Sequence, residues 1–308
     1  MKDNNQLLTH PQKSTPKMGG VSYQEALKKW SERPTQLLSS SQSLSSLESV
    51  GRTDVGRERT HNEDYFSIDQ QHFCTPDLPD GSYRGLYILC DGMGGMAKGE
   101  VASELATKTL RSYLNSRWQR HLPTEIGLEL AMNTANKAVY ERNQREQRAG
   151  SGRMGTTAVV VMVNNSHIRY VHIGDSRLYR LTRKGLQQLT TDHNAYQRAL
   201  QRGYSLEEAQ AYGPQLTKAL GPWSGESLRP QSQTLAVEED TVFLLCSDGL
   251  SDHDLLENHT HSHLMGLLDF RTDLAHGMDQ LMALANQKNG HDNITAVAVR
   301  LRPQQSSI

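Results

Sequence analysis

The sequence has few cysteines, no excess of either charge and no long apolar run. Its three cysteines, Cys74, Cys90 and Cys246, lack CxxC spacing, so they offer neither a disulfide framework nor a zinc site and fit a reducing compartment. The 33 basic and 34 acidic residues give a formal net charge of −1. This balance provides no electrostatic attraction for nucleic acid or for an anionic membrane.

Apolar stretches are short throughout the chain. The longest is AVVVMV, residues 158–163, far below the ~20 residues of a membrane-spanning helix. The N-terminus also lacks the apolar core of a secretory signal. Because 308 residues can bury a core of useful size, we expect a globular cytoplasmic protein without nucleic-acid or membrane partners.

Residues 1–46 differ from the rest of the chain. They are rich in Ser, Gln, Lys and Pro, which predicts a flexible N-terminal extension. Within residues 22–30, Tyr23, Leu27 and Trp30 share one helical face. A transient helix, or one that packs on its own domain, is the preferred interpretation, and a docking peptide for a partner is the alternative.

Strand patterns dominate after the extension. Seven stretches are typical of strands: 64–68, 86–90, 156–163, 167–173, 177–181, 241–246 and 293–301. Residues 164–166 predict a hairpin turn, and helical spacing predicts helices around 101–114, 128–139 and 264–285. This order favours antiparallel sheets covered by helices over the strand–helix alternation of a parallel nucleotide-binding sheet.

Carboxylates stand at the ends of these predicted strands. Five sites are involved: Asp91, Asp175, Asp248, Asp292 and the pair Glu63–Asp64. Turn chemistry explains any one of them, but five sites flanked by small residues indicate acids that converge at one rim of the sheets. Clustered carboxylates raise one another's pKa unless cations neutralise them. Oxygen ligands suit Mg²⁺ or Mn²⁺, and two such ions can orient a water for phosphoryl transfer.

The glycines after Asp91 allow a second interpretation. Gly92-x-Gly94-x-x-Ala97 between a strand and a helix also matches the fingerprint of dinucleotide-binding or methyl-donor-binding enzymes. That interpretation needs a regular βαβ sequence, which the chain lacks. It also leaves the acids near the C-terminus without a role, so the metal interpretation is favoured.

Eight motifs in order along residues 47–301 resemble the metal-dependent protein serine/threonine phosphatases of type 2C, in their bacterial-like branch. They are RERTHNEDYF, CDGMGGMAKGEVAS, MGTTAVVV, HIGDSRLYRL, LTTDHN, LTKALG, LCSDGLSD and HDNITAVAV. The resemblance implies an α+β protein, a four-layer α/β/β/α sandwich with two central antiparallel sheets. It implies a catalytic domain over 47–303 with a small flap insertion at about 191–221.

The activity implied by the resemblance is hydrolysis of phosphoserine and phosphothreonine in proteins by a hydroxide bound between two Mg²⁺ or Mn²⁺ ions, with a third ion in microbial relatives. Asp91 would bridge the two ions, and the backbone carbonyl of Gly92 would ligate one of them. Asp248 and Asp292 would complete the shell of the other ion. Glu63 would hold a metal-bound water.

Three further residues take roles from the same resemblance. Asp64 would support the metal shell from behind, Asp175 would help to bind the third ion, and Arg59 would pair with the substrate phosphate through its planar fork. We therefore expect Arg59, Asp64 and Asp91 to be catalytic. Met93 departs from animal members, which have a histidine there, and its thioether cannot transfer a proton.

A non-enzyme alternative is a catalytically weak relative of the same fold that serves as a phosphoprotein-binding scaffold. Such proteins usually lose ligand acids, whereas this chain keeps all six acids and Arg59. We expect a working monomeric enzyme whose partners are phosphorylated proteins and an opposing serine/threonine kinase pathway.

Overall fold

The computed structural model describes residues 43–75, 78–93, 98–118, 121–224 and 228–304. The predicted helix over 22–30 and nearly all of the predicted extension lie outside these ranges, and so do Gly94 and Ala97. None of the helices in the described ranges combines the length and the hydropathy that crossing a bilayer requires.

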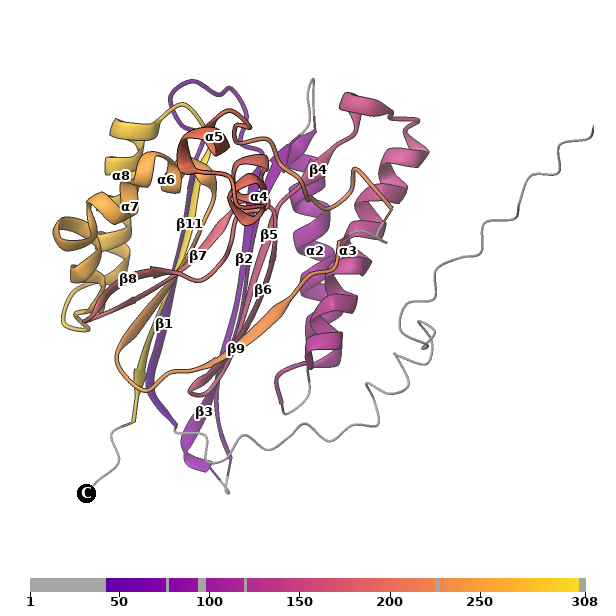
Figure 1. Ribbon diagram of the computed structural model, residues 1–308. Coiled ribbons are helices and arrows are strands. Elements are labelled where there is room, and N and C mark those ends of the chain that lie inside the picture. The colour runs from indigo at the N-terminus through magenta and orange to yellow at the C-terminus, as the bar shows by residue number, and fades with distance from the viewer. Residues whose placement is uncertain (1–42, 76–77, 94–97, 119–120, 225–227, 305–308) are drawn as a thin grey trace, which may run out of the picture. The chain divides into compact units, whose positions relative to one another are not determined.

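The described strands form two antiparallel sheets (Figure 1). One sheet has the order β1-β11-β10-β7-β8 and the other β2-β3-β5-β6-β9, with β4 beside β3. The strands are β1 (Leu44–Asp54), β2 (Asp64–Thr75), β3 (Leu78–Met93), β4 (Gly155–Thr156), β5 (Ala158–Asn164), β6 (His167–Ile173), β7 (Arg177–Thr182), β8 (Gly185–Gln188), β9 (Ser232–Ala236), β10 (Thr241–Cys246) and β11 (Ile294–Pro303). Every pairing between them is antiparallel, which confirms the predicted sheet type.

Helices cover the outer face of each sheet, so the molecule has four layers (Figure 1). Helices α2 and α3 pack on the sheet that contains β3, and α6 to α8 pack on the sheet that contains β10. The helices are α2 (Gly99–Arg117), α3 (Glu125–Arg145), α4 (Ala195–Gln201), α5 (Leu206–Gln210), α6 (Asp248–Ser251), α7 (Leu255–Asn258) and α8 (Leu274–Asn289), with short turns η1 (Gly150–Gly152), η3 (Asp252–Asp254), η4 (Thr260–Leu264) and η5 (Met265–Leu268). The predicted α+β sandwich is therefore confirmed.

Burial on both faces explains why the central strands are almost wholly apolar. In β10, Val242, Leu244 and Cys246 point to the layer of helices. The alternate residues Phe243 and Leu245 point to the layer between the sheets. Successive side chains of a strand point to opposite faces of the sheet. One apolar strand therefore contributes to two separate cores.

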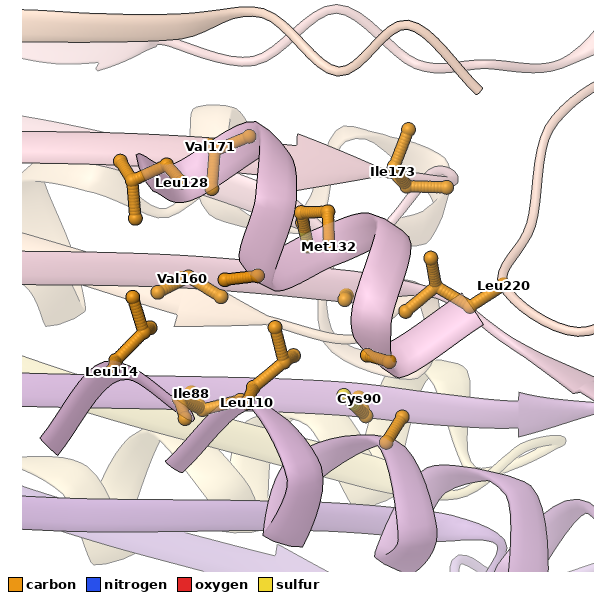
Figure 2. Close-up of a cluster of buried hydrophobic side chains, with 14 of the residues drawn as sticks. Ile88, Cys90, Leu110, Leu114, Leu128, Met132, Val160, Val171, Ile173 and Leu220 are labelled. Atoms are coloured by element: carbon orange, nitrogen blue, oxygen red, sulfur yellow. The ribbon is translucent and has the colours of Figure 1, made fainter. Parts of the chain in front are cut away.

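A further core lies between α2, α3 and their sheet (Figure 2). Leu110 and Leu114 from α2 and Met132 from α3 lie over Ile88 of β3 and Val160 of β5, and all are at most 1% exposed. Burying one such side chain stabilises the fold by about 2 kcal/mol. This layer holds β3, and hence the residues at its end, against α2 and α3.

The predicted single helix over 264–285 is wrong. The chain makes two short turns, η4 and η5, and only then begins α8 at Leu274. The interruption is stabilised by side chains, because Asp269 accepts from the backbone N–H of Arg271 and Thr272 donates to the carbonyl of Asp269. Asp273 then caps the new helix through the N–H of Ala275. Such local bonds compete with helix continuation.

The segment 191–221 carries α4 and α5 between strands β8 and β9. The Asn194 side chain caps α4 by accepting from the N–H of Gln197, and Ser205 forms a capping box with Glu208 at the start of α5. An isolated bridge pairs Asn194 with Leu216. The segment predicted as the flap therefore contains two short capped helices, and the bridge between Asn194 and Leu216 joins its two ends.

The core between α2 and its sheet gives a stability prediction. Replacing Leu110, which is 0% exposed, by alanine should lower the free energy of unfolding by about 3 kcal/mol, because it removes buried methyl groups and leaves a cavity. The matched change Leu206→Ala, at a side chain that is 67% exposed, should cost less than about 0.5 kcal/mol. Urea denaturation of both variants measures this, and equal losses would contradict the core assignment.

Candidate active site

Strand register brings the predicted acids to one edge of the two sheets. Asp64, the first residue of β2, pairs directly with Asp91 near the end of β3. In the other sheet, Asp248 follows β10 and Asp292 precedes β11, two strands that are hydrogen-bonded neighbours. Asp175 lies in the turn between β6 and β7, which links the two sheets. Acids that are far apart in the sequence thus gather where these strands begin and end.

A cavity of about 670 Å³ opens at this edge, and we call it the carboxylate cavity. It is lined by seven of the eight residues predicted for the site: Arg59, Glu63, Asp91, Gly92, Asp175, Asp248 and Asp292. Asp64 does not line it and is only 7% exposed. Met93, the residue that departs from animal members, lines the cavity as well.

Gly92 is required by the close approach of neighbouring backbone. A Cβ at this position would lie 2.2 Å from the carbonyl oxygen of Gly99 and 2.5 Å from that of Glu63. The Gly92 N–H donates to the carbonyl of Glu63 at 3.0 Å. The side chain of Glu63 accepts from the N–H of Gly99, at the start of α2. A residue with a side chain at 92 would therefore displace both Glu63 and the helix N-terminus.

The buried carboxyls raise one another's pKa. Burial, and then the charges of Asp64 and Asp248, raise the pKa of Asp91 well above its usual value. Burial, and then the charge of Asp175, do the same for the pKa of Asp248. Burial raises the pKa of Asp175 to about 7, with a further contribution from Asp192. Such a cluster is costly to ionise unless cations are present.

The carboxylate of Asp64 is oriented by a hydrogen bond from Ser247. Ser247 donates to its Oδ2 at 2.8 Å, while Ser247 Oγ accepts from the N–H of Thr295 at 2.9 Å. Burial still raises the pKa of Asp64 to about 6, against the lowering effect of bonds from Thr295 and Ser247. Ser247 therefore holds Asp64 behind the cavity wall.

The donor set suits a hard divalent cation. The Oδ1 atoms of Asp64 and Asp248 are buried without a hydrogen-bond partner, so each is an acceptor that a cation could satisfy. In the part of the chain that the structure describes, no three His, Cys, Asp or Glu side chains form a group that could hold an ion by themselves. The assignment of individual ligands therefore stays a prediction.

Arg59 lies in the loop between β1 and β2, at the mouth of the carboxylate cavity. Its Nη2 is 2.7 Å from Asp292 Oδ2, and its side chain is 51% exposed. The hydrogen bond to Asp292 is the main cause that raises the pKa of Arg59. Within the described ranges this is its single side-chain hydrogen bond, which leaves further N–H donors for an incoming oxyanion.

Several residues that orient the site were not identified from the sequence. Besides Ser247, Thr157 accepts from the N–H of Asp91 at 3.0 Å. Asn293 accepts from the N–H of Glu63 and donates to the carbonyl of His61, which fixes the loop that carries Arg59. Each of them stands beside a predicted acid or inside a quoted motif, and that adjacency was the available signal.

A sequence comparison identifies the family to which this architecture belongs. The pattern of protein phosphatase 2C matches residues 57–289. The chain belongs to the protein phosphatase 2C family. The match contains all of the sheet β2-β3-β5-β6-β9, strands β7, β8 and β10 of the other sheet, and the acids from Glu63 to Asp248. Strands β1 and β11 and the acid Asp292 lie outside it.

Individual relatives are similar in sequence to this protein over most of the chain. Protein phosphatase PhpP of Streptococcus pneumoniae is 29% identical over 259 residues, which are 82% of this chain and 97% of PhpP. The catalytic domain of the serine/threonine protein phosphatase PstP, solved with two manganese ions, is 30% identical with a TM-score of 0.64 and covers 83% of this chain and 98% of its own. The serine/threonine phosphatase Stp1 from Staphylococcus aureus is 28% identical with a TM-score of 0.67, over 84% and 96%.

The raised pKa of Asp175 makes a pH-dependent contribution to the stability of the metal-free protein. A carboxyl whose pKa is higher in the folded than in the unfolded chain favours folding while protonated, below about pH 4. This contribution to stability is lost as the pH rises through about 7, the pKa of Asp175 in the folded protein. In EDTA, Asp175→Asn should therefore raise the melting temperature by about 5 °C at pH 8 and hardly at all at pH 4.

Thermal melts of the wild type and the variant on the same buffers isolate this effect, since the other titrating groups occur in both proteins. Asp254→Asn, at an exposed residue outside the cavity, serves as the control and should give the same small shift at both pH values. An Asp175→Asn shift that does not grow with pH would contradict the clustering of acids.

Proposed function

We propose that this protein phosphatase 2C family member removes phosphate from phosphoserine and phosphothreonine in proteins, using two Mg²⁺ or Mn²⁺ ions and a third, weaker one. The observation that carries the proposal is the carboxylate cavity, which is lined by several acids. The Oδ1 atoms of Asp248 in its wall and of Asp64 behind that wall are buried without a hydrogen-bond donor. The ions would supply Lewis acidity and lower the pKa of a bound water.

The ligand roles are those that the family resemblance implies. Asp91 and the carbonyl of Gly92 would hold one ion, and Asp91, Asp248 and Asp292 the other. Glu63 would orient a water, held by its own bond to the N–H of Gly99. Asp175 would share the third ion with Asp248, which fits the finding that the charge of Asp175, after burial, raises the pKa of Asp248.

The remaining roles concern positioning and protons. Asp64 would keep the shell in place from behind, because Ser247 fixes its orientation. Arg59 would draw the phosphate to the cavity mouth and hold it in line for attack, with the P–O bond to the serine or threonine breaking as the new one forms. Met93 carries no titratable proton, so the leaving oxygen takes its proton from solvent or another side chain.

The proposal also includes the partners of the protein and its location in the cell. We expect phosphorylated proteins as substrates, a serine/threonine kinase as the opposing enzyme, and a monomer that acts in the cytoplasm. The near-neutral charge and the scarcity of cysteine support this expectation.

The metal assignment is tested by phosphate release from a phosphothreonine peptide. Release should require Mn²⁺ or Mg²⁺ and stop in EDTA. Asp248→Asn should lower the rate about 10²-fold or more, because it removes a preorganised charge from the centre of the reaction. The control Asp254→Asn, an exposed residue outside the cavity, should keep the wild-type rate. No release from folded wild-type protein would favour the scaffold alternative.

The role of Arg59 is tested by the steady-state kinetics of the same peptide. Arg59→Ala should raise KM about tenfold, since charged hydrogen bonds to the phosphate are lost, with a smaller change in kcat. Arg57→Ala, at an exposed arginine of the same loop that does not line the cavity, is the matched control. If neither KM nor kcat changes in Arg59→Ala, Arg59 has no part in the site.

A further inference from the structure

A second cavity, of about 600 Å³, lies next to the carboxylate cavity. The two cavities share Asp192 and Asn194 in their linings. The walls of the second one come from β6, β9, α4 and the segment that follows α5, including Tyr170 and Gln233. No role proposed above for the reaction uses these walls.

Positive charge dominates this second cavity, which we call the cationic cavity. Arg198, Lys218 and Arg229 line it, and within the described ranges none of them has a carboxylate within 4.0 Å. The carboxylate among its described lining residues is Asp192, which is already paired with Arg177 at 2.8 Å. Among the residues that the structure describes, these three cations thus share one cavity without a carboxylate partner.

Two of the cations are close enough to affect one another. Burial, and then the charge of Arg229, lower the pKa of Lys218. Holding like charges together costs free energy, which a bound anion would offset. Arg229 directly follows Leu228, which is buried in the core beneath α3. The arrangement is therefore complementary to a negatively charged group.

The flap separates the two cavities but leaves them connected at one edge. On α4, Tyr196 lines the carboxylate cavity, while Arg198 and Gln201 line the cationic one. Residues two apart on a helix lie on nearly opposite faces, so α4 forms the partition. A ligand that passes over the shared residues Asp192 and Asn194 can occupy both cavities.

Two stacked histidines line the side of the cationic cavity that is nearest to Asp175. His172 and His193 stack with ring centroids 4.7 Å apart, and burial lowers the pKa of both. His193 accepts from the N–H of Gly174, the residue before Asp175. The cationic cavity is thus built onto the same turn that positions a catalytic carboxylate.

Other lining groups suit a peptide better than a small ion. Trp223, which is 50% exposed, offers an aromatic surface, and Gln201, Gln231 and Gln233 offer amide donors and acceptors. A cavity of about 600 Å³ also exceeds what a single inorganic anion fills.

We propose that the cationic cavity binds an anionic side chain of the phosphoprotein substrate, either a carboxylate or a second phosphate, while the phosphoresidue lies in the carboxylate cavity. The proposal rests on the phosphatase function proposed above. It makes Arg198, Lys218 and Arg229 specificity-determining residues that select substrates with an acidic group near the phosphorylated one.

The test uses full-length enzyme with Mn²⁺ and a panel of phosphothreonine peptides. In one series a single glutamate replaces glutamine at successive positions around the phosphothreonine, and in a second series phosphoserine takes that place. We expect kcat/KM to rise about tenfold when the acidic group stands at the matching distance. The preference is the ratio of kcat/KM for the acidic peptide to kcat/KM for the neutral peptide, and Lys218→Gln should bring this ratio close to one. Partial loss of active protein does not change the ratio, since both peptides are measured on one preparation.

Arg202→Gln is the matched control, because Arg202 is exposed at the end of α4 and lines neither cavity. It should keep both the rate and the preference. Equal rates for acidic and neutral peptides at every position would overturn the proposal, and so would a preference that survives replacement of all three cations by glutamine. Inhibition of all peptides alike by sulfate, lost in Lys218→Gln, would instead indicate a site for a small free anion. Absence of release from every peptide would overturn the phosphatase function itself.

Discussion

Repulsion among buried carboxylates is the constraint on which the rest of this structure depends. Asp91 and Asp248 come from different sheets, yet the charge of Asp248, after burial and the charge of Asp64, raises the pKa of Asp91. An apolar core alone would separate such groups or keep them protonated. The sandwich holds them together because the strands that carry them are buried on both faces and cannot shift. The free energy stored in this repulsion is what a divalent cation would recover on binding.

Neutral hydrogen-bonding groups keep the acids in place without adding charge. Ser247 holds Asp64, Thr157 holds the backbone of Asp91, and Asn293 ties the start of β2 to the start of β11. Each bond joins segments that are far apart in the chain. The site is therefore rigid where the ions would bind, and its exposed charged group at the mouth is Arg59.

Helix α4 lies between two connected cavities of opposite charge. Tyr196 of α4 lines the cavity of the acids, and Arg198 lines the other, whose three cations have no carboxylate partner among the described residues. A phosphoprotein carries negative charge that the acids alone would repel, whereas the metal ions and the cationic cavity would both attract it. Catalysis and substrate selection can thus be located on opposite sides of a single short helix.

Local sequence patterns predicted most of the strands, the antiparallel type of their sheets and the acids at the strand ends, because burial and turn chemistry leave periodic signals in neighbouring residues. They did not predict β1, β8 or β9, which are largely only partly buried and so lack a clear apolar period. Nor did they predict the break before α8, where Asp269 and Asp273 replace helix bonds by side-chain bonds. Only the tertiary structure brought Ser247 to Asp64 and gathered Lys218 and Arg229 beside β6. Such contacts join segments that are distant in the chain, and no local period records them.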